Sequence, residues 1–172
     1  LQNKRDLPWR KSVDPYHIWL SEIMLQQTRV AQGLPYFLRF IEAFPTVFDL
    51  AKAPEEQVLK LWQGLGYYSR ARNLHATAKY IATELRGNFP DTYAALLNLK
   101  GVGQYTAAAI ASIAYGEAVP VVDGNVYRVL SRYFGVSSDT SAASSRKEFT
   151  ELAAKLLPAG HASHFNQAMM EF

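Results

Sequence analysis

The clearest run of helical spacing in the chain lies between residues 16 and 31. Its apolar positions are Ile18, Trp19, Ile23, Leu25 and Val30. This spacing predicts an amphipathic helix. Because residues four apart are neighbours on a helix, Glu22 and Gln26 are expected to share one face of it.

The rest of the chain repeats this pattern in shorter pieces, which proline, glycine or asparagine separate. Further helices are expected at residues 34–43, 46–50, 54–61, 68–84, 92–97, 104–115, 125–134, 146–157 and 164–172. Residues 137–145, rich in serine and alanine, are expected to form a loop. We therefore expect an all-α fold with almost no strand.

The 172 residues, of which 49% are hydrophobic, are enough for one well-buried domain or two small lobes. No apolar run approaches the roughly 20 residues that cross a bilayer, and the first residues do not resemble a signal peptide. We therefore expect residence in the bacterial cytoplasm, at the nucleoid, and no membrane partner. The net charge of +3 favours polyanions only mildly.

The chain contains no cysteine. This excludes disulfides, zinc–thiolate sites and cysteine nucleophiles within it. The four histidines show no metal-ligand spacing. We therefore expect no metal site formed by this chain.

A glycine-rich turn stands between two expected helices, at Gly101, Val102, Gly103 and Gln104. Glycine tolerates positive φ angles and leaves no Cβ in the way of a ligand. A turn of this kind can direct backbone N–H groups at an anion. It is expected to hold the backbone of a nucleic acid without reading its sequence.

Asp123 follows the strand-like run Val-Pro-Val-Val and precedes Gly-Asn, which places its carboxylate at a helix start. Cleavage of an N-glycosidic bond creates positive charge on the sugar and negative charge on the base. Such a site needs an ionised carboxylate near the sugar and an acid near the base. Asp123 suits the first role, although it could be only the N-cap of the following helix.

Glu22 suits the role of the acid, because its neighbours Ile18, Trp19 and Ile23 are apolar and apolar surroundings raise the pKa of a carboxyl group. The alternative is an ordinary solvated helix residue. Just beyond it, Gln26 and Gln27 carry amides that can replace the hydrogen bonds of a base expelled from a duplex. The alternative interpretation of Gln26 and Gln27 is that they form an ordinary polar helix end.

Residues 64–73 combine a glycine hinge, a protruding Leu-Gly-Tyr-Tyr and two arginines. This combination suits a wedge in the base stack with phosphate contacts beside it. It is equally compatible with a helix cap.

Taken together, these segments resemble the helix-hairpin-helix DNA glycosylase superfamily, and within it the adenine-specific branch. The similarity covers nearly the whole chain. It is carried, in order, by Leu7–Arg10, Trp19–Thr28, Trp62–Tyr68, Gly101–Gly103, Val122–Val126 and Asn166–Met170. The resemblance implies a fold of two helical lobes with the active-site cleft between them.

By position, Asp123 resembles the family's aspartate that stabilises the oxocarbenium ion, and Glu22 resembles the acid that protonates adenine at N7. Tyr105 and Asn125 resemble residues that assist around the sugar and Asp123. These four are the catalytic residues that the resemblance implies.

The resemblance also implies two sets of binding residues. Arg10 and Gln167 match positions that line the adenine pocket. Gln27, Leu65 and Tyr67 resemble residues that intrude near an 8-oxoguanine opposite the adenine.

One position separates branches of the superfamily. Relatives of endonuclease III carry a lysine two residues after the second glycine of the hairpin, where its amine attacks C1′ and permits strand cleavage. Here that residue is Tyr105, and a phenol forms no Schiff base. Lys100 precedes the hairpin and is not expected to substitute. The expectation is a monofunctional glycosylase that leaves an abasic site.

The family continues beyond Asn-Gln-Ala-Met-Met into four cysteines that hold a [4Fe–4S] cluster, so we expect this chain to be truncated before that loop. We expect residues 18–119 to form a contiguous lobe that includes the hairpin. Residues 1–17 and 120–172 are expected to form the second lobe.

The expected partner is double-stranded DNA with an adenine mispaired with 8-oxoguanine or guanine, bound by a monomer. Two alternatives remain open. One is another glycosylase of the superfamily, acting on mismatched thymine or oxidised pyrimidines. The other is a non-catalytic module that docks DNA.

Overall fold

The computed structural model describes residues 6–139 and 142–172, and within these ranges it contains helices and no strand. A 3-10 helix, η1 (Pro8–Arg10), comes first. The α-helices are α1 (Pro15–Leu25), α2 (Val30–Ala43), α3 (Val47–Lys52), α4 (Glu55–Trp62), α5 (Tyr68–Thr83), α6 (Tyr93–Leu96), α7 (Gln104–Ala114), α8 (Gly124–Phe134), α9 (Ala143–Leu156) and α10 (Ala162–Glu171). The expected all-α class is confirmed, and the strand-like run before Asp123 forms no strand.

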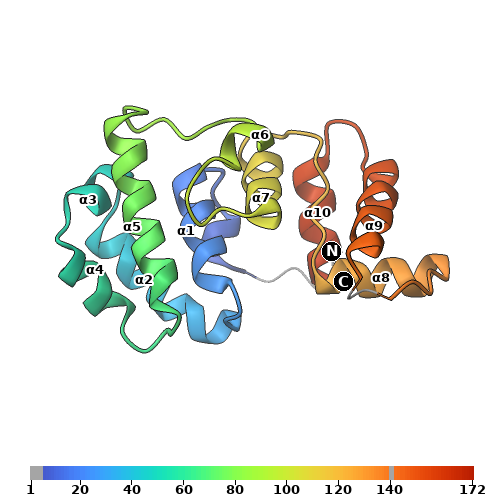
Figure 1. Ribbon diagram of the computed structural model, residues 1–172, viewed down its shortest axis with the longest axis horizontal. Coiled ribbons are helices and arrows are strands. Elements are labelled where there is room, and N and C mark those ends of the chain that lie inside the picture. Colours follow the sequence, from blue (N-terminus) through green and yellow to red (C-terminus); the bar gives the residue numbers. More distant parts are fainter. Residues whose placement is uncertain (1–5, 140–141) are drawn as a thin grey trace.

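The helices pack as two groups (Figure 1). Helices α1 to α7 surround the larger core, in which Trp19, Phe40 and Trp62 are fully buried. Helices α8 to α10 surround a smaller core around Leu130 and Phe149. Helix α10 packs against α7, and this contact joins the groups.

The first described residues pack on the larger core. Leu7, Trp9 and Tyr16 belong to the larger core, although the sequence assigned residues 1–17 to the second lobe. The Trp9 ring holds this segment there, because it packs edge-on against Phe37 of α2 with 5.0 Å between the ring centroids. Residues 1–5 lie outside the described part.

Local signals explain where several helices begin. The Asp14 side chain accepts a hydrogen bond from the Tyr16 amide at 2.9 Å and caps α1, which has Pro15 at its first position. Thr46 and Asp49 cap α3 reciprocally. Such caps satisfy N–H groups that have no partner inside the helix.

The sequence predicted one helix over residues 16–31, but the structure breaks it after Leu25. Gln27 takes a φ of 55°, which ends the right-handed helix, and α2 then begins at Val30. The expected loop at 137–145 is also shorter, because α9 begins at Ala143; residues 140 and 141 lie outside the described part. Across the described ranges, no helix is both long and apolar enough to cross a membrane.

Candidate active site

A cavity of about 680 Å³ lies where the two groups of helices meet. Residues of η1, α1, α7, α8 and α10 line it, so that segments far apart in the sequence share one site. Eight of the residues singled out from the sequence line it: Arg10, Glu22, Gln26, Gln27, Tyr105, Asp123, Asn125 and Gln167. Its volume falls in the range of small-molecule sites.

Asp123 is the N-cap of α8, as the alternative interpretation of this residue predicted. Its Oδ1 accepts from the Val126 amide at 2.9 Å, and its Oδ2 accepts from Asn125 Nδ2 at 3.0 Å. Both oxygens therefore have a donor, and the positive end of the helix dipole lies beside them. The carboxylate also lines the cavity, so capping leaves it available to a ligand.

Glu22 extends from α1 into the same cavity. Burial, and to a smaller degree the negative charge of Asp123, raise its pKa, which lies at about 7. A hydrogen bond from Tyr105 and the charge of Arg10 act in the opposite direction but are smaller. The raised pKa expected from the sequence is confirmed, and near neutral pH this carboxyl group can both hold and release a proton.

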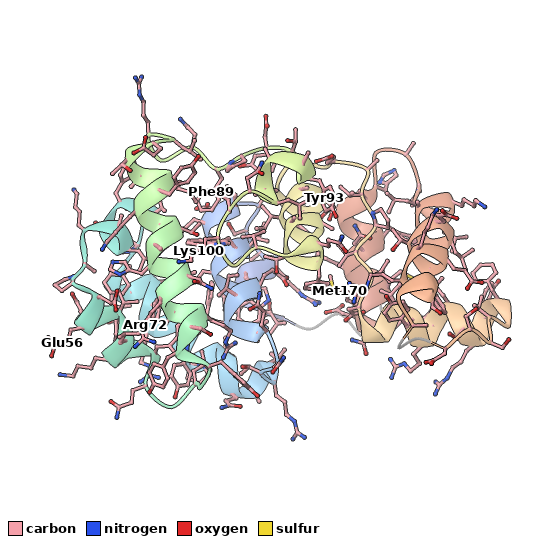
Figure 2. All side chains as sticks on the ribbon, in the orientation of Figure 1. Glu56, Arg72, Phe89, Tyr93, Lys100 and Met170 are labelled. Atoms are coloured by element: carbon pink, nitrogen blue, oxygen red, sulfur yellow. The ribbon has the colours of Figure 1, made fainter. Side chains whose placement is uncertain are left out.

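Tyr105, on the first turn of α7, donates its hydroxyl to Glu22. The hydroxyl oxygen also lies 3.3 Å from the sulfur of Met170 on α10. Burial, followed by the charges of Glu22 and Asp123, raises the pKa of the phenol, which therefore stays protonated. Lys100 lies beside α5, where its carbonyl accepts from Thr77 Oγ1 at 2.8 Å (Figure 2). Position 105 itself holds a tyrosine and not a lysine.

Arg10 forms an ion pair with Glu171, a residue that the sequence analysis did not identify. Both side chains are largely buried, and Arg10 lines the cavity. No sequence pattern signals this pair, because the partners come from opposite ends of the chain. On the same helix as Glu171, Gln167 donates its amide to Ser163 Oγ at 3.0 Å, so it faces the cavity with a fixed side chain.

The turn after α1 carries Gln26 and Gln27. Gln26 is half-buried, with its Nε2 3.5 Å from Thr106 Oγ1 on α7. Gln27 is exposed at the rim of the cavity.

The turn before α5 departs from the sequence prediction at Leu65. Its side chain does not protrude: it is 4% exposed and belongs to the larger core. Gly64 and Gly66, with φ of 94° and 79°, turn the chain so that Leu65 points inward. Tyr67 does protrude, with 63% of its surface exposed, but it does not line the cavity.

The glycine-rich turn joins α6 to α7 as a helix–hairpin–helix unit. Gly101 has a φ of 80°, Val102 is buried, and Gly103 is the exposed N-cap of α7. The first N–H groups of α7 have no partner inside the helix and point toward this end. A Cβ at Gly103 would meet no protein atom within 4 Å.

A second cavity, of about 820 Å³, runs from this hairpin to α9. Gly103 and Gln104 line one side, and the basic side chains of Arg146 and Lys147 line the other. It shares Tyr105 with the first cavity. These two basic residues could not be predicted from the sequence as part of a site, because a charge on a helix does not show what it faces.

The family model described as "HhH-GPD superfamily base excision DNA repair protein" matches residues 20–155. The chain belongs to this family. As an HhH-GPD protein it is similar to curated proteins named "Adenine DNA glycosylase". It is 46% identical to the one from Rattus norvegicus, over 99% of this chain and 35% of that relative. It is 40% identical to the one from Buchnera aphidicola, over 98% of this chain and 48% of that relative. The chain thus spans about a third to a half of these relatives.

Solved structures agree with the HhH-GPD assignment. The structure of a thermostable thymine-DNA glycosylase matches with a TM-score of 0.88 at 34% identity, over 98% of this chain and 77% of the other. A trapped endonuclease III–DNA covalent intermediate matches with a TM-score of 0.78 at 24% identity, over 91% and 72%, and supports the fold. The predicted family and two-group helical fold are confirmed.

A [4Fe–4S] cluster does not fit the residues of this chain. The ligands of such clusters are cysteine thiolates, and the chain has no cysteine. In the part of the chain that the structure describes, no group of histidine, aspartate and glutamate residues could hold a metal ion either.

Proposed function

We propose that this protein is a monofunctional adenine DNA glycosylase, which removes adenine mispaired with 8-oxoguanine or guanine and leaves an abasic site. One observation carries the proposal: Glu22, with its pKa near 7, and Asp123, with two donors on its carboxylate, line the same cavity. The similarity to proteins named adenine DNA glycosylase supports it.

The two carboxyl groups divide the work. The C1′–N9 bond breaks and its electron pair leaves with the base, which takes the proton of Glu22 at N7. The sugar becomes an oxocarbenium ion beside the negative charge of Asp123. Water then adds to C1′ and gives up a proton, which restores Glu22.

The remaining lining residues would hold the base and sugar. Tyr105 keeps its proton and is a donor beside Glu22, while Asn125 fixes the Asp123 carboxylate. Arg10 and Gln167 offer N–H donors to the edge of a purine. The phenol of Tyr105 has no amine to form a Schiff base, which supports base release without strand cleavage.

DNA would reach the site along the hairpin. The amides at Gly103 and Gln104, together with Arg146 and Lys147, line a groove that leads to Tyr105 and suits a phosphate backbone. A monomer is sufficient, because one chain supplies every residue of this arrangement. Such a protein would work where the chromosome is, in the cytoplasm of a bacterial cell.

The test is a single-turnover assay on four duplexes: adenine opposite 8-oxoguanine, adenine opposite guanine, thymine opposite guanine, and an oxidised pyrimidine. Each sample is analysed with and without alkali. We expect breaks only after alkali and only with adenine. Breaks without alkali that Asp123→Asn abolishes would contradict the monofunctional mechanism, and tight binding without product would indicate a docking module.

Thymine is the second candidate substrate. The specific observation is the match to a thymine-DNA glycosylase, of which this chain covers 77% at 34% identity. Faster release of thymine than of adenine would establish it in place of adenine.

A further inference from the structure

A buried arginine lies between two turns that reach the surface, and one of them, Gln26–Thr28, also lines the candidate active site. Arg70 on α5 is 8% exposed. Its Nη1 bonds to Ile23 O at 3.1 Å, Met24 O at 2.9 Å, Gln26 O at 2.6 Å and Thr28 Oγ1 at 3.3 Å. Its Nη2 bonds to Leu65 O at 3.3 Å and Gly66 O at 3.2 Å.

These acceptors belong to two separate turns. One set is the C-terminal end of α1 and the Gln26–Thr28 turn, where carbonyl groups have no helical partner and the helix dipole is negative. The other is the turn before α5. The backbones of the two turns therefore meet at one guanidinium group.

Each turn holds an exposed non-glycine residue in the left-handed region. Gln27 has a φ of 55° and Tyr67 a φ of 48°. This conformation costs on the order of 1 kcal/mol per residue, so the surroundings must hold it. Arg70 bonds to the residue before Gln27 and to the residue before Tyr67.

Only the planar guanidinium group of an arginine suits this position. The two ends of a guanidinium can bond to acceptors on opposite sides, whereas an ammonium group is a single point charge. The Arg70 guanidinium also lies over aromatic rings, 5.3 Å from the centroid of Trp62 and 5.5 Å from that of Tyr67. The same side chain thus contacts the ring that protrudes.

We propose that Arg70 is a positioning residue, which joins the Gln27 turn and the Tyr67 turn into one rigid unit that enters the duplex when the target base is extruded. This inference rests on the proposed function. Gln27 brings an amide to the rim of the cavity and Tyr67 brings an exposed ring. An amide can replace base-pair hydrogen bonds, and a ring can stack on the remaining base.

The first test measures base extrusion apart from chemistry. A duplex carries 2-aminopurine in place of the target adenine, opposite 8-oxoguanine, and the protein carries Asp123→Asn so that no base is lost. Arg70→Lys keeps the positive charge but removes the guanidinium group, whose two ends bond to the two turns. We expect it to bind the duplex and to lose most of the fluorescence increase that accompanies extrusion.

A second experiment distinguishes a positioning role of Arg70 from general damage to the fold. With Asp123 intact, we expect Arg70→Lys to slow adenine release opposite 8-oxoguanine by at least about 10-fold, equivalent to about 1.4 kcal/mol. Release opposite an abasic position, where no pair must be broken, should fall less than about 3-fold. Equal losses on both substrates, or none on either, would overturn the proposal.

Arg132→Lys is the matched control. Arg132 lies on the last turn of α8, is exposed, and lines neither of the two cavities described above. It should match the unsubstituted protein in both arms. If the unsubstituted protein releases no adenine, the proposed function fails, whereas the fluorescence arm still decides the role of Arg70.

A double-mutant cycle leaves Arg70 in place and so avoids any folding defect. Gln27→Ala and Tyr67→Ala are measured singly and together for extrusion. If the two turns act as one unit, the second substitution adds little to the first. Additive effects would show that the turns act independently.

Discussion

Glu22 and Asp123 carry the same chemical group in different surroundings. Glu22 is buried with the Tyr105 hydroxyl beside it, and its pKa rises to about 7. Asp123 has a backbone amide and an amide side chain on its two oxygens. Environments of this kind assign one carboxyl group to proton donation and the other to charge stabilisation.

The first prediction concerns the rate of base release as a function of pH. Because only protonated Glu22 can donate, the single-turnover rate should fall as pH rises through about 7. Glu22→Gln should lower the rate by about 10²-fold or more and remove this part of the profile. A profile with the same midpoint in Glu22→Gln would assign the proton to another group.

The second prediction concerns stability. The folded-state pKa of Glu22 lies above its ordinary value of 4.5, so the folded protein loses stability as pH rises from about 4.5 to about 7. The neutral side chain of Glu22→Gln avoids this loss. Its free energy of unfolding should exceed that of the unsubstituted protein by at least about 1.4 kcal/mol at pH 8 and by little at pH 4.5.

Urea denaturation at the two pH values measures this difference directly. A constant difference between the two proteins would mean that Glu22 has an ordinary pKa.

For single residues, the sequence was informative where a property depends only on the residue and its neighbours in the chain. Apolar neighbours predicted the raised pKa of Glu22, and Gly-Asn after Asp123 predicted its place at a helix start. Glu171 was missed, and Arg70 was expected to contact phosphate although it is buried, because most of their partners lie far away in the chain and only folding brings them together. The burial of Leu65 was missed because its direction depends on the φ angles of two glycines.

At the scale of elements, the two glycines of the hairpin differ in backbone conformation and in surroundings, which the sequence alone does not show. Gly101 needs its φ of 80°, and a Cβ there would lie 3.0 Å from Asn73 Cβ. Gly103 has an ordinary φ of −92° and open space around it. Nothing inside the protein requires a glycine at 103, which suits the approach of an outside ligand.

The third prediction follows from this contrast. Gly103→Ala should leave the melting temperature nearly unchanged but weaken duplex binding, because its methyl group faces the expected phosphate path. Gly101→Ala should lower the free energy of unfolding by about 1 kcal/mol or more. Binding by Gly103→Ala equal to that of the unsubstituted protein would place the phosphate path elsewhere.

Most elements were predictable from the sequence, because their limits depend on local signals such as Asp14-Pro15 before α1 and Gly135 after α8. The break after Leu25 was not. The run from Tyr16 to Ala31 keeps its apolar spacing, and it is interrupted by a positive φ at Gln27 and by bonds to Arg70 from another helix.

At the scale of the whole molecule, the site depends on how the two groups of helices are joined. Asn166 on α10 is buried, donates to Val119 O at 2.9 Å and accepts from the Val121 amide at 3.0 Å. It therefore anchors the segment that leads to Asp123. The division into lobes stays a prediction, although the packing of residues 7–16 on the larger core could not be read from the sequence.

The fourth prediction tests this anchor. Asn166→Ala leaves a buried amide and a carbonyl without partners, at a cost of about 1–3 kcal/mol. We expect a lower melting temperature and slower base release, because Asp123 shifts relative to Glu22. His164→Ala, at an exposed position of the same helix, is the control and should do neither. Full activity in Asn166→Ala would show that the hydrogen bonds do not position the site.

The central claim is that Asp123 does chemistry as well as capping α8, and one comparison tests it most directly. Asparagine caps helices about as well as aspartate but carries no charge. In Asp123→Asn, single-turnover release of adenine opposite 8-oxoguanine should disappear, while the melting temperature and the affinity for the duplex stay close to those of the unsubstituted protein. Undiminished release would contradict the claim and leave Asp123 as a helix cap alone.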